Sequence, residues 1–225
     1  GLGDVYKRQA MFPSGASLLL PAVLHGAADA GIDIEAAHLD VGYTDAPPKL
    51  AEYAVVVTHR DERTPSVTLP RVSVTELMRE PLDVIVSLDS TLAERDSVAV
   101  SELADCDWIS VEGGFPVDDV LLSISAITGV APRVTQRMLD FTTIEALVAA
   151  GHGIALMPRF AVRHPRVKRL ELKGVRAARV YEALTRPRAR GAVGTVVALL
   201  VDAGAERVCA STASKKPDDG APTAP

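Results

Sequence analysis

Two hydrophobic patterns alternate along the chain and predict its elements. Short apolar runs such as Tyr53 to Val57 are typical of strands buried on both faces, as in a parallel sheet. Residues 117–128 instead repeat apolar positions every three or four residues, which is typical of an amphipathic helix. Because strands and helices follow one another along the sequence, the pattern predicts an α/β fold.

The same two patterns place the remaining elements. We expect helices at residues 14–29, 47–52, 101–104 and 191–205. We expect strands at residues 10–12, 32–37, 67–74, 82–88, 107–111, 133–138, 167–172 and 178–184. Ser14 is the candidate N-cap of the first helix, and Pro21 inside that helix should strain or kink it.

Residues 138–160 carry the most informative local pattern. Thr142 is placed to accept a hydrogen bond from the backbone three residues on, and Glu145 is placed to reach back to Thr142, as in a capping box. Gly151 should end that helix, and Gly153 should let the chain reverse closely into a buried strand. The segment is therefore predicted to be a capped helix, a Gly-x-Gly turn and a short strand.

Composition narrows the class of protein. The chain has 225 residues, is 48% hydrophobic and only 4% aromatic, so we expect a core of Val, Leu, Ala and Ile. Its net charge of -5 argues against direct binding to a nucleic-acid backbone. The longest apolar run, residues 16–24, is too short to cross a membrane. Cys106 and Cys209 lie far apart without metal-ligand spacing, which favours reduced thiols in a cytoplasmic protein.

The two ends of the chain differ from the rest. Residues 1–9 lack an initiator Met and read like a translated sequencing adapter, so we interpret them as non-native and expect the native chain to continue upstream. Residues 209–225 are mostly small, polar or Pro and are expected to form a disordered tail.

Several landmarks in order resemble the effector-binding domain of LysR-type transcriptional regulators. They are the segment Phe-Pro-Ser-Gly-Ala at 12–16, Glu-Pro-Leu at 80–82, the helix-to-strand step at 103–109, and residues 138–160. The resemblance covers residues 10–208, whereas the family's N-terminal helix-turn-helix is missing and residues 40–53 depart from its pattern.

The resemblance implies an α/β fold of two Rossmann-like lobes joined by two crossover strands, as in type 2 periplasmic binding proteins. Lobe I would combine residues 10–78 with 159–208, and lobe II would be residues 79–158. In open α/β sheets, ligands bind beyond the carboxyl ends of the strands. Helix N-termini there offer free N–H groups and partial positive charge, which suits a small carboxylate.

Such ends define the candidate ligand-binding residues. They are Ser14, Gly15, Ala16, Thr58, His59, Ser110, Glu112, Gly113, Asp140, Thr142 and Thr143. The alternative for several of them is a purely structural role. Ser14 and Thr142 would then do no more than cap their helices, and His59 would be solvated after its strand. The sequence shows no catalytic residue, P-loop, dinucleotide fingerprint or metal-ligand spacing, so we expect no cofactor and no metal.

The resemblance implies a cytoplasmic regulator that senses a small, anionic metabolite in the cleft between the lobes. It also implies a homo-oligomer, a dimer or tetramer in the full-length protein, in which the first helix and strand 32–37 of one subunit contact helix 117–128 of another. DNA would be bound only through the missing N-terminal domain, and no membrane is involved. The alternatives are a transporter's solute-binding protein with the same fold and an enzyme, which would need a reactive residue.

Overall fold

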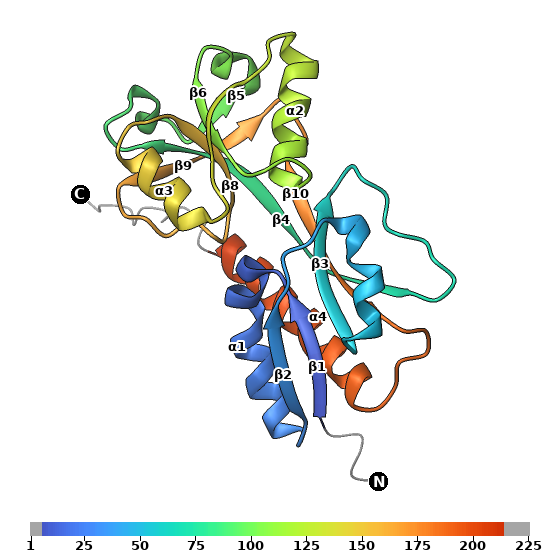
Figure 1. Cartoon of the computed structure of the whole chain (residues 1–225). Coiled ribbons are helices and arrows are strands. Elements are labelled where there is room, and N and C mark those ends of the chain that lie inside the picture. The colour runs from blue at the N-terminus through green and yellow to red at the C-terminus, as the bar shows by residue number, and fades with distance from the viewer. Residues whose placement is uncertain (1–5, 214–225) are drawn as a thin grey trace, which may run out of the picture.

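The computed structural model describes residues 6–213 and consists of two lobes joined by two shared strands (Figure 1). Within these residues, eight strands follow one another in the order β2-β1-β3-β10-β4-β8-β6-β7. Strand β9 also pairs with β4, and β5 pairs with β9. The strands are β1 Tyr6–Met11, β2 Asp33–His38, β3 Val55–Asp61, β4 Ser73–Ser87, β5 Ser97–Ala99, β6 Asp107–Ser110, β7 Arg133–Arg137, β8 Ile154–Pro158, β9 Val167–Lys173 and β10 Ala178–Thr185. The helices are α1 Pro13–Asp29, α2 Pro116–Thr128, α3 Phe141–Ala149 and α4 Ala192–Ala213, with 3-10 turns at Tyr43–Asp45, Pro47–Ala51, Thr91–Glu94 and Val100–Leu103.

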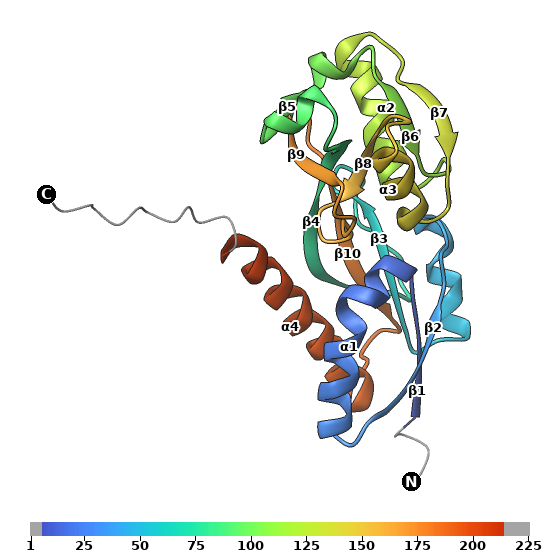
Figure 2. The same cartoon turned by 90° about the vertical axis from the view of Figure 1, so that its left-hand side faces the viewer.

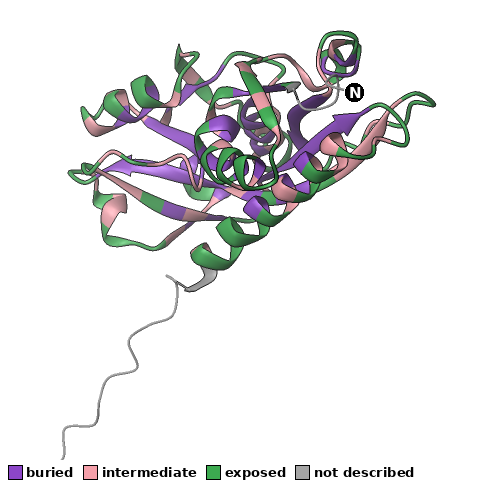
Figure 3. Cartoon of the chain, turned by 90° about the horizontal axis from the view of Figure 1, so that it is seen from below, coloured by how far each residue is buried: buried purple, intermediate pink, exposed green. Residues whose placement is uncertain are grey.

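Lobe I is built on the parallel strands β2, β1 and β3 and on the antiparallel β10. Alternation along β3 directs Val55 and Val57 to a core shared with α1 and α4, whereas Val56 packs on the other face. Helices α1 and α4 lie side by side over that core (Figures 1 and 2). Their outward faces are exposed, the central strands β3 and β10 are buried, and the edge strand β2 is largely exposed (Figure 3).

Lobe II has its own apolar core. Strand β6 runs parallel to β7 and β8, and β8 pairs antiparallel with the second half of β4. Trp108 on β6, Ile124 on α2 and Ile144 on α3 are all buried in this core. The predicted α/β class with two lobes is therefore confirmed.

One long strand replaces two that the sequence predicts. The pattern predicts separate strands at residues 67–74 and 82–88, but β4 runs without a break from Ser73 to Ser87. Glu80 falls between the two predicted strands. It is fully buried, in an ion pair with Arg179 on β10.

The return from lobe II to lobe I occurs later than residue 158, where the sequence analysis places it. Strand β9 pairs with β4 and β5, and Leu170 and Leu172 belong to the core of lobe II. The returning strand is β10, and the segment before it packs with lobe II from Ala161 onward, whereas Phe160 contacts the core of lobe I. Glu145 of α3 keeps the chain there, because its carboxylate accepts the backbone N–H groups of Arg163 and His164 at 2.6 and 2.8 Å.

The two ends also differ from expectation. Strand β1 begins at Tyr6, so the second half of the expected adapter segment pairs with β2 and β3. Helix α4 continues to Ala213, five residues into the segment expected to be disordered. Residues 1–5 and 214–225 lie outside the described residues.

Gln9 is an unusual residue for the middle of a sheet. It is fully buried in β1, between Ala36 of β2 and Val55 of β3, and neither atom of its side-chain amide has a hydrogen-bond partner. A buried amide without partners costs about 1–3 kcal/mol. The expectation that residues up to Gln9 are non-native remains a prediction, and this uncompensated amide accords with it.

We predict that Gln9→Met stabilises the protein, because methionine has a similar length and no polar group to leave unpaired. The free energy of unfolding should rise by about 1 kcal/mol or more, measured by urea denaturation. The matched control is Gln136→Met on the exposed strand β7, which should change stability by less than about 0.5 kcal/mol. A loss of stability in Gln9→Met would show that the amide contributes to the fold.

Candidate functional site

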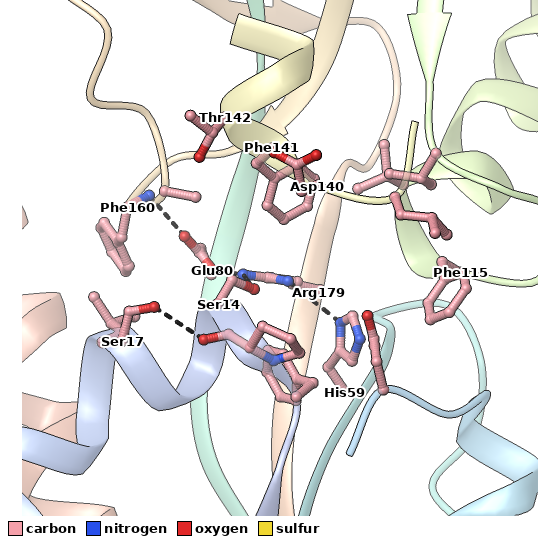
Figure 4. Close-up of a pocket in the computed structure, with 18 of the residues that line it drawn as sticks. Ser14, Ser17, His59, Glu80, Phe115, Asp140, Phe141, Thr142, Phe160 and Arg179 are labelled. Carbon is pink, nitrogen blue, oxygen red and sulfur yellow. Dashed lines mark hydrogen bonds and ion pairs between the residues drawn. The ribbon is translucent and has the colours of Figure 1, made fainter. Parts of the chain in front are cut away.

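A cavity of about 530 Å³ lies where the two lobes meet (Figure 4). Its volume is within the usual range of small-molecule sites, about 300–1,000 Å³. Lobe I contributes the start of α1 and residues of β3, β4 and β10, and lobe II contributes the starts of α2 and α3. The chain has four phenylalanines, and all of them line this cavity: Phe12, Phe115, Phe141 and Phe160.

A buried ion pair forms the polar base of the cavity. Arg179 of β10 is 1% exposed and donates from Nε to Oε2 of Glu80 of β4 over 2.9 Å. The Tyr181 hydroxyl donates to the same oxygen at 2.7 Å, and the other carboxylate oxygen accepts the backbone N–H of Phe160 at 2.6 Å. Burial lowers the pKa of Arg179, but Glu80 and Tyr181 together raise it above its ordinary value, so the guanidinium stays charged.

The remaining donors of Arg179 point toward the cavity. Nη2 donates to the hydroxyls of Tyr181 at 2.6 Å and Ser14 at 3.1 Å. Among the described residues, Nη1 meets one acceptor, His59 Nδ1, at 3.4 Å. The guanidinium carbon also lies over the rings of Phe12 and Phe141, at 5.3 and 5.9 Å from their centroids.

His59 is held neutral. Burial, and secondarily the charge of Arg179, lowers the pKa of the imidazole well below its ordinary value of 6.5. Its ring stacks on Phe12 with centroids 4.1 Å apart. Because Nδ1 faces the donors of Arg179, the proton of the neutral ring is assigned to Nε2.

The start of α1 differs from its predicted cap. The N-cap residue is Phe12, which makes no side-chain cap bond, and Pro13 occupies the first helical position. Ser14 therefore lies inside the first turn, where it is not a cap, and its hydroxyl accepts from Arg179. The prediction of Ser14 as the N-cap is wrong because Pro is favoured at the first helical position. Pro13 therefore begins the helix, and the residue before it is the N-cap.

The start of α3 also differs. Asp140 caps it, because its carboxylate accepts the Thr143 backbone N–H at 2.8 Å and the Thr143 hydroxyl at 2.7 Å. These bonds, the side-chain one first, lower the pKa of Asp140 below its ordinary value of 3.8. The predicted capping box is wrong, since Thr142 is not the cap and Glu145 instead holds the chain after β8.

The cavity brings together about half of the predicted ligand-binding residues. Those that line it are Ser14, His59, Glu112, Asp140 and Thr142. Those that do not are Gly15, Ala16, Thr58, Ser110, Gly113 and Thr143.

For three of the residues outside the cavity the structure shows the reason. Thr58 follows the alternation of β3 and points to the face opposite His59. Gly15 lies against Phe12, and a Cβ there would meet the ring at 2.6 Å. Gly113 lines a second, smaller hollow beside residues 42–45.

The sequence analysis did not identify the residues at the base of the cavity as candidate site residues. Arg179, Tyr181 and Glu80 all lie within strands whose neighbouring residues are mostly apolar. A charged residue in such a run signals a buried, paired group, since an unpaired charge there would be prohibitively costly. That signal is visible in the sequence, but it does not say which charges pair.

Two lobes that share crossing strands and enclose a cavity characterise the type 2 periplasmic-binding-protein-like domains. The sequence model of the LysR substrate binding domain matches residues 10–205 of this chain. The chain therefore belongs to the LysR substrate-binding domain family, whose members are parts of transcriptional regulators.

Solved structures of the same fold agree with this assignment. The effector-binding domain of QuiR in complex with shikimate has a TM-score of 0.72 and 17% identity, covering 89% of this chain and 97% of that one. A cysteine mutant of OxyR from Corynebacterium glutamicum has a TM-score of 0.74 and 19% identity, covering 94% of this chain and 68% of that one.

One curated relative resembles part of the sequence. The hydrogen peroxide-inducible genes activator of Dickeya chrysanthemi is 29% identical over 92 residues, which is 41% of this chain. The match spans only 30% of the relative's length. A full-length relative of the same fold, CbnR, has been solved with its target DNA, at a TM-score of 0.71, 18% identity, and coverage of 90% of this chain and 72% of that one.

We predict that Asp140→Ala destabilises the domain by about 1 kcal/mol through loss of the cap, whereas Thr142→Ala changes stability by less than about 0.5 kcal/mol. Because the pKa of Asp140 is lowered in the folded state, the deficit of Asp140→Ala should be present above pH 3.8 and shrink as the pH falls below it. Thermal unfolding of both variants against pH measures this. The reverse order of destabilisation would restore Thr142 as the cap.

Proposed function

We propose that this chain is the effector-binding part of a cytoplasmic LysR-type regulator and that a small anionic metabolite binds in the cavity between its lobes. The proposal is supported above all by Arg179, a fully buried cation whose Nη1 faces a cavity walled by both lobes. No helix within residues 6–213 is long and apolar enough to cross a membrane.

Arg179 favours an anionic head group for a reason of geometry. Its Nε and Nη2 are engaged by Glu80, Tyr181 and Ser14, but Nη1 has two N–H groups and one long contact to His59. A ligand carboxylate at Nη1 would provide the missing acceptor.

The helix N-termini contribute less than the sequence suggests. Pro13 has no N–H to offer at the start of α1, and Asp140 already caps α3. The rim also carries the carboxyl groups of Asp40 and Glu112. Burial raises the pKa of Asp40, while the charge of Arg179 acts in the opposite direction. We therefore place the head group at Arg179.

The placement of Arg179 suggests how binding is transmitted. Arg179 and Glu80 lie on β10 and β4, the two strands that connect the lobes. A ligand that contacts Arg179 and also the start of α3 would favour the arrangement in which the lobes lie close together. In the full-length regulator this shift would reorient the DNA-binding domains, which are not part of this chain.

Thiol-based sensing is a poor second candidate. A cysteine senses peroxide as its thiolate. Burial, and then the carboxylates of Asp105 and Asp107, raises the pKa of Cys106 above its ordinary value. Neither Cys106 nor Cys209 forms a disulfide. The family assignment likewise does not favour the solute-binding or enzyme alternatives.

We predict that a thermal-shift screen of small carboxylic acids finds a ligand whose affinity falls about tenfold in Ser14→Ala, because Arg179 loses part of its positioning. The matched control is Thr195→Ala in the first turn of α4, where the hydroxyl donates to the Gly191 carbonyl at 3.3 Å and does not line the cavity. That variant should bind normally. Thr142→Trp, which places a large ring in the cavity wall, should abolish binding. Unchanged affinity in both Ser14→Ala and Thr142→Trp would move the site away from this cavity.

We also propose that the chain forms the dimer implied by its family, with α1 and β2 of one subunit against α2 of the other. Apolar side chains are exposed on these helices: Leu24 of α1 is 40% exposed, and Leu122 and Ile127 of α2 are 61% and 53% exposed. In a symmetric dimer, each contact between α1 and α2 occurs twice, so these apolar side chains would be covered on both subunits.

Light scattering coupled to size exclusion tests the dimer. We predict twice the chain mass of 23.8 kDa for the unchanged protein and the single mass for Leu122→Glu. Leu69→Glu is the matched control, since Leu69 is 44% exposed in the loop between β3 and β4, and it should stay dimeric. A Leu122→Glu protein that remains dimeric would rule out α2 as the interface.

A further inference from the structure

We infer that the effector is an aromatic carboxylic acid, with its carboxylate on Arg179 and its ring among the four phenylalanines of the cavity. This inference rests on the proposed function, which places a small acid in the same site. It goes further by specifying the body of that ligand.

The concentration of phenylalanine in one place is the first observation. Aromatic residues make up only 4% of the chain, yet every phenylalanine lines this one cavity. They come from four separate segments: the starts of α1, α2 and α3, and the turn after β8. Figure 4 shows Phe141 above, Phe115 to one side and Phe160 to the other, around Arg179.

The helix starts show that these rings are not the best choice for folding. Phe12 and Phe115 occupy the N-cap positions of α1 and α2, and neither makes a side-chain cap bond. Ser, Thr, Asp or Asn at an N-cap would add about 1 kcal/mol of helix stability. The chain forgoes that stability at two helices whose N-cap residues line the cavity.

The rings are also incompletely buried. Phe12 is 3% exposed, but Phe115, Phe141 and Phe160 are all half-buried. They approach from both sides, since Phe160 packs against the core of lobe I and Phe115 and Phe141 against that of lobe II. A planar ring between the lobes would cover their remaining apolar surface and gain offset or edge contacts with them.

The short distance from Arg179 to the phenylalanine rings links the position of the ligand's carboxylate to the position of its ring. The guanidinium carbon of Arg179 lies 5.3 and 5.9 Å from the ring centroids of Phe12 and Phe141. A carboxylate on Nη1 would thus bring the ring attached to it directly among the phenylalanines. A longer aliphatic diacid would place its second charge on this apolar wall, which is costly.

Isothermal titration of the full chain with five probes tests this inference. Benzoate and 2-naphthoate carry ring and charge, cyclohexanecarboxylate keeps the charge and the size without aromaticity, benzyl alcohol keeps the ring without the charge, and succinate lacks any ring. We expect at least one aromatic acid to bind about tenfold or more tightly than each of the other three.

Two variants assign the effect to the rings. Phe141→Leu should weaken the aromatic acid about fivefold or more while leaving cyclohexanecarboxylate within about twofold. Tyr53→Leu, which removes an aromatic ring packed away from the cavity beside β3, should bind all probes normally. Circular dichroism of each variant verifies that it folds.

The outcomes separate this inference from the proposed function. If cyclohexanecarboxylate or succinate binds as tightly as the aromatic acids, the inference is overturned and the acid site stands. If benzyl alcohol matches benzoate, the anionic head group is wrong and both fail. If neither aromatic acid binds, the inference is overturned, and the cavity itself is judged by the wider acid screen and the Thr142→Trp variant.

Discussion

The buried ion pair between Arg179 and Glu80 is the interaction on which the rest of this structure depends. It joins β10 to β4, the two strands that connect the lobes, and it lies at the base of the cavity between them. Removing one partner of such a pair leaves an uncompensated charge and typically costs about 3–5 kcal/mol. The pair is satisfied by Tyr181 and the Phe160 backbone, so the cation is kept in place without any ligand. The residues that stabilise the boundary between the lobes are therefore the same ones that form the polar base of the cavity.

Strand β10 carries buried charge on both of its faces. Arg179 and Tyr181 face the cavity, while Glu182 points to the opposite side and accepts from Arg60 at 2.8 Å and from Tyr43 at 2.6 Å. Each face of the connecting strand is thereby tied to lobe I by charge-assisted bonds. A loop of lobe I also reaches lobe II, where Arg63 donates to the Asp119 carbonyl of α2 at 3.1 Å. Polar links of this kind hold the lobes together at their boundary.

Much of the fold could be predicted because its elements are defined by local periodicity. The helix at 117–128 and the buried strand before Thr58 follow from the spacing of apolar residues. The errors arose where tertiary pairing overrides local preference. Glu80 lies outside both predicted strands but in the middle of β4, and the residue it pairs with lies about a hundred positions away. Thr142 fits a capping box, but Asp140, two residues earlier, caps the helix. Glu145 instead accepts a hydrogen bond from the backbone after β8.

By itself the sequence determined the α/β class, the two-lobed architecture and the family, since alternating patterns and ordered landmarks are properties of the chain in one dimension. It also predicted a site at strand ends and helix starts, where ligands bind in such folds, and this stays a prediction. Only the tertiary structure decided which residues line the cavity between the lobes. His59 enters it and Thr58 does not, because strand alternation assigns them to opposite faces. The gathering of Phe12, Phe115, Phe141 and Phe160 around Arg179 likewise required the lobes to be folded together, since residues so far apart in the chain become neighbours only through packing.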